Sequence, residues 1–131
     1  MNEFIERIRR IIEDVNRERG PFTFAALVDR SDNPVPGKFD LLVSAPWIGR
    51  DKEFYEYLKP ILSGELREID WLRLARVLVL NPSGEFLRDF QQVTGPLTND
   101  KDIRNVRIAD IDVRYAHSFA IPPNIMAHAN A

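Results

Sequence analysis

Hydrophobic residues recur at helical spacing over the first part of the chain. The apolar positions are separated by steps of three or four, with Glu and Arg on the other face; they are Phe4, Ile5, Ile8, Ile11, Ile12 and Val15. Gly20 and Pro21 then supply a stop signal. The pattern predicts an amphipathic helix. Because acids balance bases in this segment, we expect the apolar stripe to pack on the protein's own sheet and not on a membrane.

Two short apolar runs follow, at residues 22–28 and 39–45. Each is too short for a stable helix, and the connector between them contains two Pro and one Gly, which favour an exposed loop. We therefore predict an antiparallel pair of strands. Neither run alternates cleanly between apolar and polar residues, so we expect both strands to be covered on both faces.

Residues 39–80 predict a strand, a helical crossover and a second strand. We expect Asp51 to cap a helix that Pro60 either kinks or divides into two short pieces. Asp70 is expected to cap a further short helix that leads directly into the apolar run Val77–Leu80. That run has the composition of a buried parallel strand, and connections of this type are almost always right-handed.

The last third of the chain predicts one more helix and an alternating segment. The helix covers residues 82–93, and the phase of the alternation that follows changes near Ala109–Asp110. Such a change requires a bulge or a turn, and the alternation beyond it is clean. We expect the final strand to be antiparallel and to lie at or near an edge of the sheet. Residues 122–131 are predicted to form a C-terminal tail.

Together these elements predict an α/β or α+β fold in a single domain, residues 1–121. It consists of a mixed β-sheet of four to five strands flanked by about three helices. A βαβ unit occupies residues 39–80, and a C-terminal antiparallel edge strand completes the sheet. The chain of 131 residues is long enough to bury one well-filled core.

Composition excludes several function classes. The formal net charge of −2 provides no general field for nucleic acid or for an anionic membrane, so neither is an expected partner. Cysteine is absent, which excludes disulfides, thiol nucleophiles and zinc–thiolate sites. The charged N-terminal segment is unlike a signal peptide, and no apolar run approaches the roughly 20 residues of a membrane span. We expect a cytoplasmic protein, bacterial in style, that uses no cofactor.

Motifs of the large enzyme families are missing. The sequence has no G-x-G-x-x-G or G-x-x-x-x-G-K-[ST] phosphate loop, no G-x-S-x-G elbow and no H-E-x-x-H pair. The chain has a helix followed by strands, with Asp29 and Asp40 at strand positions. In this outline it is similar to restriction-endonuclease-like cores. Those cores need an acid followed two positions later by Lys, which holds metal and water together, and that spacing is absent here. An inactive nuclease-like fold is therefore the least favoured alternative.

The best place for a binding site is the end of the predicted parallel strands. Two loops, residues 44–51 and 81–85, leave the carboxyl ends of these strands and enter helix N-termini, where free N–H groups suit an anion. The candidate ligand-binding residues of this crest are Ser44, Trp47, Arg50, Asp51, Asn81 and Ser83. The crest predicts a site for a small carboxylate or phosphate. The simpler alternative, which we favour, is that Trp47 plugs the end of the core.

A second candidate is a metal site at Asp110 and Asp112. Carboxylates two residues apart on a strand point to the same side and can share a divalent cation. The phase change next to Asp110 weakens this hypothesis, and His117 lies on the opposite alternation to Asp112. Solvated acids on an edge strand, which discourage pairing with another edge, are the favoured alternative.

The leading functional hypothesis is a small non-catalytic binding or interaction module that self-associates. A regulatory module is one form of this hypothesis. Large apolar residues without a catalytic grouping beside them motivate it. The predicted contact residues are Trp71, Tyr115, Ile121 and Ile125. The expected partner is a second copy of the chain, as a homodimer, or another protein. The alternative is a small-anion sensor or enzyme that uses the crest at residues 44–51 and 81–85.

Overall fold

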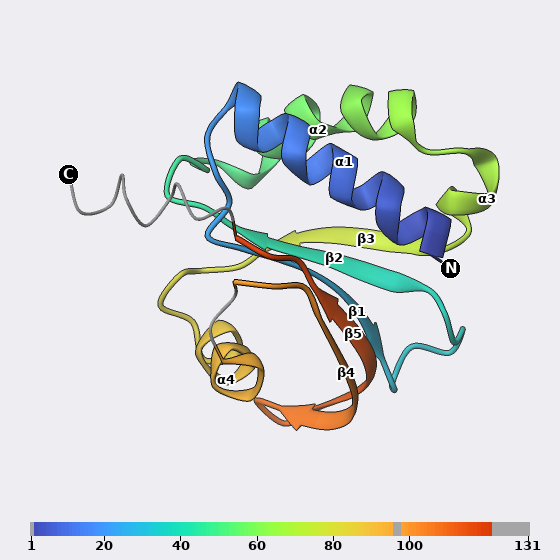
Figure 1. The fold of residues 1–131 in the computed structure, drawn as a ribbon, viewed down its shortest axis with the longest axis vertical. Helices are drawn as coiled ribbons and strands as arrows, with labels where there is room; N and C mark the ends of the chain where they lie inside the picture. The colour runs from blue at the N-terminus through green and yellow to red at the C-terminus, as the bar shows by residue number, and fades with distance from the viewer. Residues whose placement is uncertain (1, 96–97, 122–131) are drawn as a thin grey trace.

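The protein is a single α+β domain built on one mixed sheet of five strands, seen in a computed structural model that describes residues 2–95 and 98–121 (Figure 1). The helices are α1 (Asn2–Glu18), α2 (Asp51–Glu65), α3 (Glu68–Trp71) and α4 (Glu85–Thr94). The strands are β1 (Phe24–Arg30), β2 (Phe39–Ser44), β3 (Leu74–Val79), β4 (Lys101–Ile108) and β5 (Ile111–Ser118).

The strands lie in the order β3-β2-β1-β5-β4. β1 and β2 are antiparallel, β2 and β3 are parallel, and β5 is antiparallel to both of its neighbours. The strand–helix–strand unit predicted for residues 39–80 is confirmed, with α2 and α3 in its crossover. The last strand is antiparallel as expected, and it lies one place inside the sheet because β4 occupies the edge.

Helices cover both faces of the sheet. α1 and α2 pack on one face and share a core with β1, β2 and β5. The fully buried side chains of this core include Phe4, Ile8, Ile11, Leu27, Phe39 and Leu41. α4 covers the other face, where Leu87 and Phe90 share a second core with Phe24, Val28 and Ile108. The sheet curls so that the β4–β5 hairpin bends around α4 (Figure 1).

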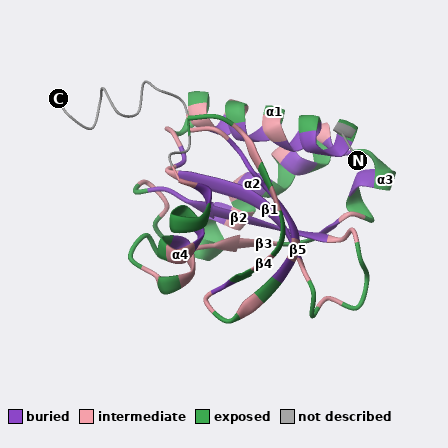
Figure 2. Cartoon of the chain, turned by 60° about the horizontal axis from the view of Figure 1, so that its bottom comes forward, coloured by how far each residue is buried: buried purple, intermediate pink, exposed green. Residues whose placement is uncertain are grey.

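Strands β1 and β2 are buried along almost their whole length, as the absence of alternation predicts (Figure 2). β3 differs from expectation. It lies at the edge of the sheet, and after Leu74 its residues are half-buried or exposed. An apolar run indicates a parallel strand, but it does not determine whether that strand has one neighbour or two.

Asp70 is not the cap of α3. The N-cap is Arg67, and the Asp70 carboxylate accepts a hydrogen bond from the Arg67 backbone N–H at 2.8 Å. The same carboxylate is buried and receives two hydrogen bonds from Arg7 of α1, at 2.5 and 2.8 Å. The Arg7–Asp70 pair therefore joins α1 to the crossover, and breaking a buried pair of this kind is costly.

α2 begins one residue earlier than the sequence suggests, because Arg50 is its N-cap and Asp51 lies in its first turn. The helix continues through Pro60, whose ring faces solvent. In the described part of the chain, no helix is both long enough and apolar enough to cross a membrane.

A bulge in β5 changes the face of the sheet towards which the side chains of this strand point. Asp29 pairs with Tyr115, but the next residue of β1, Arg30, pairs with Val113, so Arg114 is an extra residue. Val113 therefore points into the core with α4, and Tyr115 points into the core with α1. The expected turn before β5 is present, and both of its residues have positive φ. The clean alternation expected after it is interrupted by the bulge.

Candidate functional site

The two loops of the predicted crest leave the same end of the sheet and turn to opposite faces. The loop after β2 leads to α2, and the loop after β3 leads to α4 on the other side (Figure 1). Asn81 lies in the loop before α4, and its Oδ1 accepts hydrogen bonds from the backbone N–H and the hydroxyl of Ser83, at 3.0 and 2.9 Å. Ser44 is fully buried, and its hydroxyl has no partner among the described residues. Of the predicted set, Trp47 and Arg50 line one hollow.

Trp47 both closes the end of the core and forms a wall of that hollow. Its indole N–H donates to the backbone carbonyl of Pro21 at 3.1 Å. The indole ring lies 5.5 Å from Phe22 and 5.8 Å from Phe54, between ring centroids. Gly20 has a φ of 123°, and a Cβ at this position would stand 3.2 Å from the indole. These contacts hold the ring in one orientation.

We call this hollow the Trp47 pocket. It lies between the end of α1 and the start of α2 and has a volume of about 300 Å³. Its main walls are Arg19, Trp47, Arg50, Glu53, Phe54 and Tyr57. The Arg19 guanidinium lies 5.7 Å from the Trp47 ring and 4.9 Å from the Tyr57 ring. Sequence reasoning missed Arg19, Glu53 and Tyr57 because no local pattern shows that the end of α1 meets the start of α2.

The proposed metal pair lies at the β4–β5 turn. Asp110 and Asp112 share one cation, Arg107, whose guanidinium nitrogens lie 3.7 and 3.6 Å from their carboxylates. Both carboxylates are well exposed. Across residues 2–95 and 98–121, no cluster of three or more His, Asp or Glu side chains is arranged to hold a metal ion. The geometry favours solvated acids that pair with Arg107.

Asp29 and Asp40, the acids of the nuclease-like alternative, are buried on the neighbouring strands β1 and β2. Asp29 accepts hydrogen bonds from Arg114 and from the backbone N–H of Gly37, both at 3.0 Å. Asp40 pairs with Arg76 at 3.0 Å. Their carboxylate oxygens are already bonded to guanidinium groups, so this geometry gives no support to a nuclease-like metal site.

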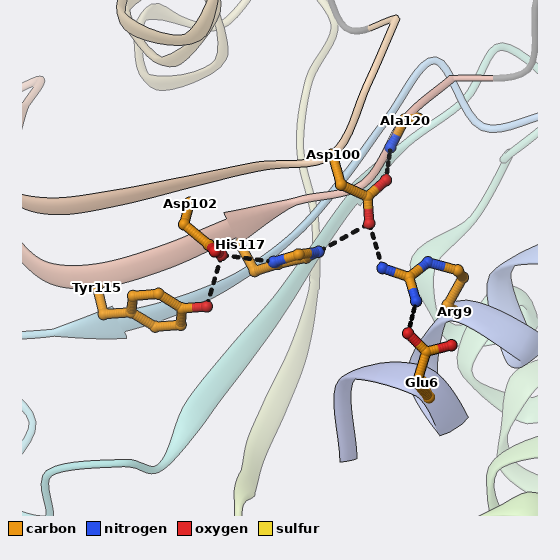
Figure 3. A network of polar contacts seen from close by, with 7 residues as sticks. All are labelled: Glu6, Arg9, Asp100, Asp102, Tyr115, His117 and Ala120. Carbon is orange, nitrogen blue, oxygen red and sulfur yellow. Dashed lines mark hydrogen bonds and ion pairs between the residues drawn. The ribbon is translucent and has the colours of Figure 1, made fainter. Parts of the chain in front are cut away.

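A hydrogen-bonded network that the sequence does not reveal joins the β4–β5 hairpin to α1 (Figure 3). The His117 ring lies between two carboxylates, with Nδ1 2.6 Å from Asp102 Oδ1 and Nε2 2.9 Å from Asp100 Oδ2. Tyr115 donates its hydroxyl to Asp102 at 2.6 Å. Asp100 also pairs with Arg9 of α1. Because His117 and Tyr115 follow the bulge, both point to the α1 side of the sheet.

These contacts lower the pKa of both carboxyls. The hydrogen bond from Tyr115 is the main cause at Asp102. At Asp100, burial acts in the opposite direction, and hydrogen bonds from Arg9, from the Ala120 backbone N–H and from His117 outweigh it. Burial, together with the bond to Asp102, raises the pKa of Tyr115, which stays a neutral donor. The hydrogen bonds run from β5 through Asp100 to Arg9 of α1, so the network links the hairpin to this helix.

The predicted contact residues lie in different surroundings. Trp71 is 41% exposed at the end of α3. Tyr115 is buried in the core with α1, so it is not part of the surface. Ile121 is half-buried beside α1, and Ile125 lies outside the described residues.

Trp71 has exposed apolar neighbours and an open strand edge after it. Ile69 and Leu72 are 58% and 73% exposed, and the chain then enters β3, which has a neighbouring strand on one side only within residues 2–95 and 98–121. In Figure 2 most of α3 is coloured as exposed and much of β3 as intermediate. We call Ile69, Trp71, Leu72 and the outer edge of β3 the α3–β3 surface.

Neither a protein family, nor a curated protein, nor a solved structure matches this chain. Two surfaces of the protein bear on its function. The Trp47 pocket offers cationic groups and aromatic walls. The α3–β3 surface offers apolar side chains beside backbone groups that no strand in the described part of the chain pairs.

Proposed function

We propose that the chain is a non-catalytic interaction module that self-associates through the α3–β3 surface. The open edge of β3 is the observation that carries this proposal. Among the described strands, β3 pairs with β2 alone, so one row of its backbone N–H and C=O groups points away from the sheet. A row of this kind is a template for pairing with another strand.

The opposite edge of the sheet, β4, is protected against such pairing. Its sequence KDIRNVRI has charged residues at four of eight positions, and Asn105 interrupts it at a φ of 53°. Charges and irregular backbone are the usual means by which natural edge strands avoid association. β3, with the sequence LARVLV, has a single charge, and Asp40 of β2 binds that Arg76 guanidinium at 3.0 Å. Its edge is therefore the more favourable one for pairing.

A second copy of the chain fits the β3 edge. Antiparallel pairing about a two-fold axis would join two β3 strands into one continuous sheet, as in isologous dimers. With the axis at Val77, Arg76 would stand opposite Leu78 of the partner, so like charges would not meet. α3 of each copy would then approach the carboxyl end of the other β3, where Val79 is half-buried. The exposed apolar side chains of α3 would be covered there.

Light scattering after gel filtration, at micromolar concentration, tests the proposal. The unchanged protein should have the mass of two chains. Leu72→Glu places a charge in the contact at a position that is 73% exposed, so it should give the mass of one chain without disturbing the fold. Val93→Glu is the matched control, because Val93 is also apolar and 45% exposed but lies on α4.

Two results contradict the proposal. A mass of one chain for the unchanged protein excludes self-association and favours a different protein as the partner. A dimer that Leu72→Glu leaves intact, or that Val93→Glu disrupts equally, places the contact elsewhere. A regulatory role and a cytoplasmic location stay predictions from the sequence.

A further inference from the structure

Two arginines of the Trp47 pocket have no carboxylate within ion-pair distance in the part of the chain that the structure describes. Other arginines of α1 do have one: Arg7 pairs with Asp70, and Arg17 pairs with Asp14. Arg19 instead has its guanidinium over the rings of Trp47 and Tyr57. A guanidinium held against aromatic faces is ordered in advance and keeps its N–H groups available at the edge of its plane.

The start of α2 adds further donors to the same wall. Arg50 is the N-cap of this helix, and its side chain supplies no acceptor for the N–H groups of the first turn. Backbone bonding begins with Phe54, whose N–H donates to the Arg50 carbonyl at 3.1 Å. Free N–H groups and the positive end of the helix dipole favour an anion at this position.

Tyr57 supplies an aromatic wall of the pocket beside Arg19. Its hydroxyl oxygen is buried, and the Glu18 carboxylate lies near it. Burial and the negative charge of Glu18 raise the pKa of Tyr57, so the group is a neutral phenol. Because the hydroxyl oxygen is not exposed to the pocket, Tyr57 offers a ligand the face of its ring and not a hydrogen bond.

The size and walls of the pocket limit the ligand. A volume of about 300 Å³ is at the small end of the range for small-molecule sites. The aromatic walls, Trp47, Phe54 and Tyr57, suit a flat body. Glu53 also lines the pocket, and its carboxylate disfavours a second negative charge on the ligand. A monoanion is therefore a better fit than a phosphate dianion.

We infer that the Trp47 pocket binds a small planar carboxylate, an aromatic acid of the kind that benzoate represents. Arg19 and Arg50 bind the carboxylate, and the ring lies along the indole of Trp47. This inference does not depend on self-association, because the pocket lies at the end of α1 opposite to α3.

Nuclear magnetic resonance of the indole N–H groups tests the inference on the unchanged protein. The chain has two Trp residues, so Trp47 reports on the pocket and Trp71 serves as an internal control. Titration with benzoate should move the Trp47 signal to saturation and leave the Trp71 signal in place. Acetate, which lacks the flat body, and inorganic phosphate, which has the extra charge, should each need about tenfold higher concentrations.

Variants then identify the groups that bind. Arg19→Gln and Arg50→Gln should each weaken benzoate binding about tenfold, because each removes a charge-assisted hydrogen bond. Arg88→Gln is the matched control, since Arg88 is an exposed arginine on α4. The inference is overturned if benzoate gives no saturable shift, if phosphate binds more tightly than benzoate, or if Arg50→Gln binds benzoate as well as Arg88→Gln does. Arg50 is exposed, so its replacement leaves the fold intact and keeps this comparison decisive.

Discussion

The same substitution at two glycines should have opposite effects on stability. Gly20 follows α1 with a φ of 123°, and a Cβ there would stand 3.2 Å from Trp47 Cδ1. Gly64 is an exposed residue in the last turn of α2, and a Cβ there would have no heavy atom within 4 Å. We expect Gly20→Ala to destabilise the protein and Gly64→Ala to stabilise it.

The magnitudes follow from the backbone. An alanine held at the φ of Gly20 costs about 1–3 kcal/mol, and relief of the indole contact adds to that cost. Gly64→Ala should add about 0.5–1 kcal/mol, because alanine loses less backbone entropy in a helix. For a chain of 131 residues, 1 kcal/mol changes the midpoint of thermal unfolding by about 4 °C. We therefore expect a decrease of at least about 4 °C for Gly20→Ala and an increase of about 2–4 °C for Gly64→Ala.

Circular dichroism on heating measures both midpoints, and urea denaturation converts them to free energies of unfolding. The native tryptophan fluorescence of Gly20→Ala should also change, because the added methyl group touches the indole of Trp47. A midpoint for Gly20→Ala equal to that of the unchanged protein would refute the argument from φ and contact. So would a loss of stability in Gly64→Ala as large as the loss in Gly20→Ala.

Three further changes test the core and the buried charges. Phe90→Ala should cost about 3–5 kcal/mol in urea denaturation, whereas Val93→Ala, on the exposed side of α4, should stay within about 0.5 kcal/mol. The Arg7 hydrogen bond holds the pKa of Asp70 below its ordinary 3.8, so this group stabilises the fold above that pH and loses its effect as pH falls through the folded pKa. The stability difference between Asp70→Asn and the unchanged protein should therefore shrink on acidification, and a constant difference would contradict the assignment. Tyr115→Phe should raise the pKa of Asp102, measured by carboxyl titration in nuclear magnetic resonance.

Local patterns of apolar residues were sufficient for most of the elements. Helical spacing over residues 4–15 predicts α1, and the unalternating runs 22–28 and 39–45 predict strands buried on both faces. The parallel pairing of β2 with β3 follows from the length and content of the segment between them. These features depend on residues that are close in sequence, so a periodicity of two or 3.6 is enough to find them.

The candidate sites were only partly predictable. Trp47 and Arg50 could be found because a Pro-Trp corner before a helix start is a local signal. Arg19 and Tyr57 could not, because they reach the pocket from the turn after α1 and from the second turn of α2. The two loops of the crest diverge because α2 and α4 cover opposite faces of the sheet. Neither loop sequence indicates on which face the following helix packs.

The sequence by itself determined the helices, the central strands and the corner at Trp47. Only the tertiary structure decided that β3 lies at an edge, that a bulge at Arg114 turns His117 towards α1, and which charges pair. Arg7 and Asp70, for example, meet across 63 positions of sequence. The physical reason is that periodicity reports the average surroundings of one element. Sheet order, bulge position and long-range ion pairs instead depend on how all the elements bury their surfaces together.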